Sequence, residues 1–146
     1  MNNSISIIIP ILNERKNIKK LFNEINKKLF GIKYEIIFVD DKSTDGSIDV
    51  LKELNRLDKR FQFLIHKGKP DLTQSCFKGI EKSKNNLIVI MDGDLQHNPI
   101  YIKALLNKIL NEKSDIVIGS RSFSKLNVNS ISPTRVFFFK NTNIII

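Results

Sequence analysis

The sequence is poor in cysteine and has no long apolar run. Cys76 is the only cysteine among 146 residues, so no disulfide can form within the chain, and we expect a reducing compartment. No stretch approaches the roughly 20 apolar residues of a membrane span, and the first residues lack the basic segment of a signal peptide. The expected location is cytoplasmic, with a peripheral place on the cytoplasmic face of the membrane left open. Cys76 itself is expected to be a small buried apolar residue rather than a nucleophile.

Glycine-rich nucleotide loops are also missing. No Gly-x-Gly-x-x-Gly follows the first apolar run and no Gly-Lys-Ser/Thr occurs anywhere, which disfavours a dinucleotide dehydrogenase and a P-loop NTPase. A sugar nucleotidyltransferase is disfavoured because its glycine-rich first loop is absent. A response-regulator receiver would place a lysine after its fifth strand, where this chain has Gly-Ser-Arg at residues 119–121.

The chain is basic, with a net charge of +9, but the pattern does not favour nucleic acid as a partner. Lysine far outnumbers arginine, and the basic residues are scattered rather than gathered in one run. Ala104 is the only alanine, a bias that AT-rich coding would produce. An anionic membrane surface or a phosphate-bearing substrate remains compatible with the charge.

Short apolar runs alternate with helical patterns and predict an α/β fold with a mostly parallel sheet. Asn13 is expected to cap the first helix, and Asn98 and Pro99 to start the last one. Pro10 is expected to close the first strand. The strands are expected at residues 5–9, 34–39, 61–65, 87–91 and 115–119, and the helices at 14–30, 48–57, 72–83 and 99–110.

Polar residues follow four of the five expected strands. They are residues 13–14, 40–41, 92–94 and 120–121. In parallel sheets ligands bind outside the carboxyl ends of the strands, so these groups predict a site on one edge. Alternatively, Asp40 and Asp41 belong to a helix-capping turn. His66 also ends a strand, and the sequence indicates no partner for it.

Asp92 and Asp94 directly follow the fourth strand. Side chains two positions apart on an extended segment point the same way, so the two carboxylates can converge. Their repulsion is relieved by a cation, and oxygen ligands with an amide nearby suit Mg²⁺ or Mn²⁺. The alternative is an ordinary polar turn. His97 is expected to be a structural hydrogen bonder rather than a metal ligand.

The pattern ends after residue 121. Residues 122–133 are loop-like, and residues 136–139 and 144–146 are apolar. These apolar residues either pack on the sheet or belong to an element of a longer protein. We expect a nucleotide-sugar-binding domain at 1–125 and the start of an acceptor-binding part at 126–146.

Four segments together resemble the family 2 glycosyltransferases of GT-A fold, and most of all the polyprenyl (dolichyl) phosphate mannosyl- and glucosyltransferases. The resemblance covers about residues 4–125 and implies a three-layer, Rossmann-like, nucleotide-sugar-binding fold. The segments that carry it are residues 7–14, 39–46, 91–99 and 118–121.

The resemblance also implies roles for individual residues. Leu12 stands where the family has an aromatic beside the base. Residues 69–72 replace a glycine-rich turn of the family, so no role is transferred to residues 69–72. Asp94 and Arg121 would be catalytic. The implied metal ligands are Asp92, Asp94 and Gln96, and the implied nucleotide-sugar contacts are Pro10, Leu12, Glu14, Val39, Asp41, Asp92, Gly93, Asp94, Arg121 and Arg135.

The activity implied is inverting transfer of a hexose from a GDP- or UDP-sugar to an acceptor, which we expect to be polyprenyl phosphate. A phosphate acceptor is already ionised at neutral pH and needs no strong base, whereas a sugar hydroxyl needs a carboxylate base. No base is evident after Arg121, which favours a phosphate. The alternative is a truncated, non-catalytic nucleotide-sugar-binding or assembly domain. The sequence does not indicate an oligomeric state.

Overall fold

The computed structural model describes residues 4–119 and 143–145 of the chain. Within these residues six strands form one sheet in the order β3-β2-β1-β4-β6-β5, and every pairing is parallel. The strands are β1 (Ile5–Ile11), β2 (Tyr34–Asp40), β3 (Phe61–Ile65), β4 (Leu87–Ile90), β5 (Ile116–Val117) and β6 (Asn143–Ile145). The helices are α1 (Arg15–Lys28), α2 (Ser47–Leu57), α3 (Leu72–Lys82) and α4 (Tyr101–Glu112).

Strand β1 lies at the centre, hydrogen-bonded to β2 on one side and β4 on the other, and all of its residues are buried. The expectation that Pro10 closes this strand is wrong, because β1 continues to Ile11 opposite Asp40. Backbone groups alternate between the two neighbours, and Ile5 donates toward β2 while Ile8 accepts from Met91. Pro10 therefore faces the β4 side, where β4 has already ended at Ile90, and no sheet hydrogen bond is lost.

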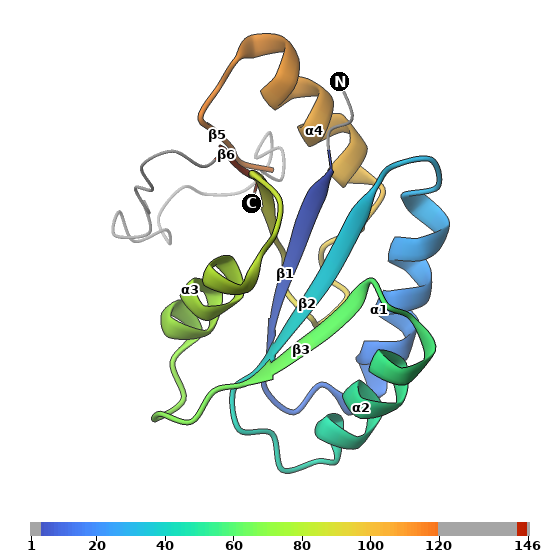
Figure 1. Cartoon of the computed structure of the whole chain (residues 1–146), viewed down its shortest axis with the longest axis vertical. Coiled ribbons are helices and arrows are strands. Elements are labelled where there is room, and N and C mark those ends of the chain that lie inside the picture. Colours follow the sequence, from blue (N-terminus) through green and yellow to red (C-terminus); the bar gives the residue numbers. More distant parts are fainter. Residues whose placement is uncertain (1–3, 120–142, 146) are drawn as a thin grey trace, which may run out of the picture.

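The helices form layers on both faces of the sheet, as the α/β expectation requires (Figure 1). Among the described helices only α3 covers one of the faces, where Ile80 packs against a small cluster that includes Ile8 and Val39. On the other face, apolar residues of α1, α2 and α4 pack against the alternate residues of β1 in the main core. Successive side chains of β1 point to opposite faces of the sheet, so this one strand contributes apolar residues to both cores.

Two local expectations about the helices are wrong. Asn13 does not cap α1; it has a φ of 60°, its Oδ1 accepts from Thr44 N at 2.8 Å, and Glu14 holds the N-cap position. Helix α4 begins at Tyr101 rather than Pro99, because Asn98 Oδ1 accepts from Ile100 N and closes a turn ahead of the helix.

The far side of the sheet differs most from expectation. Strand β5 has two residues instead of the five expected. Strand β6 lies between β4 and β5, with Ile144 opposite both Ile88 and Ile116. The tail thus pairs within the sheet as a strand, whereas residues 136–139, the other apolar segment of the tail, lie outside the described part of the chain. No helix among the described residues is long and apolar enough to cross a membrane.

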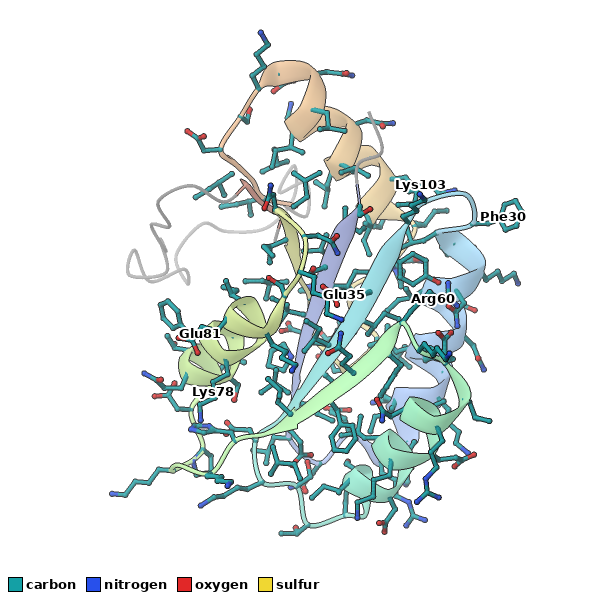
Figure 2. All side chains as sticks on the ribbon, in the orientation of Figure 1. Phe30, Glu35, Arg60, Lys78, Glu81 and Lys103 are labelled. Atoms are coloured by element: carbon teal, nitrogen blue, oxygen red, sulfur yellow. The ribbon has the colours of Figure 1, made fainter. Side chains whose placement is uncertain are left out.

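The amino edge of the sheet is closed by a buried carboxylate, Glu35 (Figure 2). Its oxygens accept from Ser6 Oγ at 2.6 Å, Lys84 N at 2.7 Å and Gln62 Nε2 at 2.8 Å. These donors come from β1, the α3–β4 turn and β3, so one side chain joins the starts of neighbouring strands. Phe30 projects outward near this edge, and its carbonyl accepts from Lys103 Nζ.

We predict that Gly79→Ala destabilises the fold. A Cβ at Gly79 on α3 would lie 2.3 Å from Ile8 Cγ2 and 3.2 Å from Val39 Cγ2. The clash is expected to lower the free energy of unfolding by about 1–3 kcal/mol, beyond the roughly 1 kcal/mol gained from alanine's helix propensity. Urea unfolding measures the change.

Glu81→Ala on the exposed side of the same helix is the matched control and should change the free energy of unfolding by less than about 0.5 kcal/mol. A Gly79→Ala variant as stable as the wild type would show that α3 does not pack this closely on β1.

Candidate nucleotide-binding site

A cavity of about 250 Å³ opens at the carboxyl edge of the sheet. Its lining comes from the end of β1 and the residue after it, from Asp41 after β2, and from residues at and just before the start of α3. Leu12 and Leu72, which are 47% and 51% exposed, give the mouth two apolar side chains. The residues that line the cavity are Pro10, Ile11, Leu12, Asp41, Pro70, Asp71 and Leu72.

Asp41 is the buried acidic group of this cavity and is only 6% exposed. Its backbone N donates to Ile11 O at 2.8 Å, which continues the β1–β2 ladder past the last strand residues. Its Oδ1 lies 2.7 Å from His66 Nδ1, and its Oδ2 accepts from Asp71 N at 2.7 Å. The carboxylate is thus held from the ends of two further elements, β3 and α3.

The loops after β1 and β2 are tied to each other. Asn13 N donates to Ser43 Oγ at 2.7 Å, and Arg15 N donates to Asp45 at 2.9 Å. Asp40 Oδ1 accepts from Ser43 N, so Asp40 builds the turn that was one interpretation of the Asp40–Asp41 pair. Asp41 takes no part in that turn, and its carboxylate is left for the cavity.

The loop that carries Asp92 and Asp94 lies beside the end of β1. The premise that both residues extend the strand is wrong, because β4 ends at Ile90 and the chain turns at Gly93 and Asp94. Gly93 is buried, and a Cβ there would lie 2.5 Å from Ile11 Cγ2. Glycine therefore lets the acidic loop pack against a residue that also lines the cavity.

The donor set of this loop fits a hard divalent cation. The Asp92 side chain is 55% exposed, and Asp94 Oδ1 accepts from Gln96 N at 2.9 Å. Open carboxylates on one short loop suit Mg²⁺ or Mn²⁺, which keep several water ligands and take few from the protein. Among the described residues no group of three or more His, Cys, Asp or Glu side chains is placed to hold a metal.

His97 lies near this loop but is not hydrogen-bonded to Asp92. Its Nδ1 is 3.8 Å from Asp92 Oδ2, which is beyond hydrogen-bonding distance. The contact becomes an ion pair only when the imidazole is protonated.

The remaining predicted site residues fall into two groups. Glu14 and Val39 lie at the carboxyl edge but do not line the cavity: Glu14 Oε2 accepts from Asn17 Nδ2, and Val39 is fully buried under α3. Arg121 and Arg135 lie outside the described residues. Their roles stay predictions.

Sequence reasoning missed the wall formed by Pro70, Asp71 and Leu72 and missed the partner of His66. One signal was available: Pro-Asp before a helical pattern is typical of an N-cap, and Asp71 Oδ1 indeed accepts from Gln74 N at 3.0 Å. Such a cap follows the end of β3 and so belongs at the same edge as Asp41. The contact of His66 with Asp41 left no pattern, since it depends on how β2 and β3 pair.

The chain matches a known protein family over most of its length. The family model described as Glycosyl transferase family 2 matches residues 6–145. The chain belongs to glycosyl transferase family 2. A relative named dolichol-phosphate mannosyltransferase, from Pyrococcus furiosus, is 40% identical over 118 residues. The match covers 80% of this chain and 33% of that relative, so the chain spans about a third of the relative's length. The resemblance inferred from the motifs is confirmed.

Solved structures confirm the GT-A fold of this family 2 chain. S. aureus TarS in complex with UDP-GlcNAc aligns with a TM-score of 0.65 and 21% identity, over 87% of this chain and 37% of that one. Glucosyl-3-phosphoglycerate synthase from Mycobacterium tuberculosis, in complex with Mn²⁺, UDP and glucosyl-3-phosphoglycerate, aligns with a TM-score of 0.63 and 19% identity, over 82% and 44%.

Cys76 on α3 is inactivated by its surroundings. Burial, together with the negative charges of Asp92 and Asp71, raises the pKa of the Cys76 thiol to about 11. The neutral thiol is favoured at physiological pH, which disfavours a nucleophilic role. The expectation of a fully buried residue is wrong, because Cys76 is only partly buried.

We predict slow alkylation of Cys76 in the folded protein. At pH 8 its thiolate fraction should be roughly 100-fold lower than in the unfolded chain, and iodoacetamide should react correspondingly more slowly. The stability that the buried thiol contributes is present below the unfolded pKa and is lost as pH rises toward 11. Equal alkylation rates in buffer and in denaturing urea would contradict the burial of this thiol.

Proposed function

We propose that this chain forms the nucleotide-sugar-binding part of an inverting hexosyltransferase, and that the donor is a GDP- or UDP-hexose. The observation that carries the proposal is the juxtaposition of a cavity holding a buried carboxylate, Asp41, with the Asp92–Asp94 loop, across the end of β1. The cavity suits a nucleoside, and the acidic loop suits a metal-bound diphosphate. Membership of glycosyl transferase family 2 supports the same assignment.

The nucleoside would occupy the cavity. Leu12 and Leu72 offer apolar contact to the faces of a base, and Pro10 lies beneath them at the end of β1. Asp41 can accept hydrogen bonds from N–H groups of the base or O–H groups of the ribose, because an ionised carboxylate offers acceptors only. The family resemblance implies that Glu14 and Val39 are nucleotide-sugar contacts. They do not line the cavity, so they would act from positions next to it.

The diphosphate would lie along the acidic loop. Asp92, Asp94 and Gln96 would hold a Mg²⁺ or Mn²⁺ ion, which when bound neutralises charge on the leaving diphosphate. Buried against Ile11, Gly93 keeps these side chains beside the nucleoside cavity. Arg121 and Arg135, which lie outside the described residues, are proposed to donate forked hydrogen bonds to phosphate oxygens.

In the proposed reaction an acceptor oxygen bonds to the anomeric carbon of the hexose as the bond from that carbon to the diphosphate breaks. The nucleoside diphosphate leaves with the bonding electrons, and the anomeric configuration inverts. Polyprenyl phosphate is the proposed acceptor because the Pyrococcus furiosus relative is named a dolichol-phosphate mannosyltransferase. Its phosphate oxygen is already ionised, so no general base is required of this chain.

A place on the cytoplasmic face of the membrane is part of the proposal. A net charge of +9 favours attraction to anionic lipid headgroups, where a polyprenyl phosphate resides. Residues 126–146 are proposed to begin the acceptor-binding part, with β6 returning the chain to the sheet beside β4.

Calorimetric titration with UDP- and GDP-sugars, with and without Mn²⁺, tests the proposal. We predict that at least one of these nucleotide sugars binds and that Mn²⁺ increases its affinity. Asp94→Ala should weaken the Mn²⁺-dependent binding at least about tenfold, because a ligand of the cation is removed.

The matched control is Glu112→Ala, which removes an exposed carboxylate at the end of α4 and should leave the affinity within about twofold. Unchanged binding by Asp94→Ala would count against the metal site. Binding without hexose transfer to polyprenyl phosphate in detergent would favour the alternative, a non-catalytic binding domain.

A further inference from the structure

His66 and Asp41 form a buried pair at the carboxyl edge. His66 follows β3 directly, is 5% exposed, and places Nδ1 2.7 Å from Asp41 Oδ1. Ser75 Oγ on α3 lies 3.5 Å from the same nitrogen. The backbone N of His66 donates to Asp40 O at 2.8 Å, so the residue is hydrogen-bonded to the end of β2, directly before its partner Asp41.

The direction of the hydrogen bond follows from the chemistry of the pair. An ionised carboxylate only accepts, so Nδ1 of His66 must carry the proton and donate to Asp41 Oδ1. Asp41 Oδ2 accepts from Asp71 N at 2.7 Å. Donors from two different elements, one on each oxygen, leave the Asp41 side chain a single orientation.

The backbone at Gly68 also packs against the imidazole, on the side of its other nitrogen, Nε2. A Cβ at Gly68 would lie 2.6 Å from His66 Nε2, so the backbone of the β3–α3 loop lies directly against the ring. A side chain at position 68 would have to displace the ring or the loop. The ring is therefore confined between this loop and Asp41, and it cannot move away from the carboxylate without moving the loop.

Glu35 at the amino edge and Asp41 at the carboxyl edge are both buried carboxylates, but they differ in what surrounds them. Glu35 at the amino edge accepts from Ser6, Gln62 and Lys84, and it lines no part of the cavity. Asp41 is fixed by His66 and Asp71 and faces the cavity that Leu12 and Leu72 flank. The first arrangement joins strands, whereas the second places a hydrogen-bond acceptor at the lining of a cavity.

We propose that His66 is a positioning residue of the nucleotide site: by donating to Asp41 it holds that carboxylate in the orientation that accepts from N–H or O–H donors of a bound nucleoside. This inference rests on the proposed function. It adds to that function a residue that does not itself line the cavity.

The test compares the dissociation constants of UDP and GDP, with Mn²⁺, for two His66 variants. His66→Leu removes the donor and should raise the dissociation constant of the preferred nucleotide about tenfold. His66→Asn places an amide N–H near the position of Nδ1 and should restore most of the affinity. Gly68→Ala, which displaces the ring from its other side, should also weaken binding, whereas the exposed neighbour Lys67→Ala should not.

Two further variants separate positioning from general destabilisation. Gln62→Leu, on the same strand β3, removes a hydrogen bond to buried Glu35 at the opposite edge and should leave the affinity within about twofold. In an Asp41→Asn background, His66→Leu should cause little additional loss, because the two residues act through one hydrogen bond.

The outcomes are distinct. If the wild type binds a nucleotide and His66→Leu binds it equally well, the positioning role is overturned while the proposed function stands. It is also overturned if Gln62→Leu weakens binding as much as His66→Leu, or if His66→Asn restores nothing. If the wild type binds neither nucleotide, the proposed function fails and this inference fails with it.

Discussion

The parallel pairing of β1 with β2 and β4 is the constraint on which the site depends. It brings the carboxyl ends of three strands to one edge, and it is stabilised by isoleucines buried on both faces of β1. Each such side chain contributes roughly 1.5–3 kcal/mol by leaving water. Two glycines allow the close packing around this strand: Gly79 brings α3 onto Ile8, and Gly93 brings the acidic loop onto Ile11.

Each of the two edges of the sheet holds a buried, hydrogen-bonded carboxylate in a different setting. At the amino edge a single carboxylate, Glu35, accepts from donors on several elements and closes the sheet. At the carboxyl edge Asp41 is also held by hydrogen bonds on both oxygens, but it lines a cavity, and the loop after β4 exposes the side chain of Asp92. The same chemistry, a buried hydrogen-bonded carboxylate, thus joins strands at one edge and lines a cavity at the other, where we propose that it binds a nucleoside.

The sequence predicted the parts of this arrangement that repeat locally. Apolar runs identified the five strands from β1 to β5, and their alternation with helices predicted parallel pairing and hence the edge at which Asp41, Asp92 and Asp94 gather. It did not predict β6, because three apolar residues at the end of a loop-like stretch carry no periodic signal. It placed Asn13 as a cap because a side chain that bonds a helix start and one that bonds a distant loop look alike in sequence. The His66–Asp41 contact joins residues 25 positions apart and exists only through strand register.

The most direct test of the central claim is NMR of the ¹⁵N-labelled chain with UDP or GDP and Mn²⁺, whose paramagnetism broadens nearby amide signals. The account predicts broadening at residues 11–12, 41, 71 and 92–96, with the signals of Glu35 and Asn85 at the amino edge unaffected. Broadening centred on the amino edge, or none at residues 92–96, would contradict a nucleotide-diphosphate site across the ends of β1, β2 and β4.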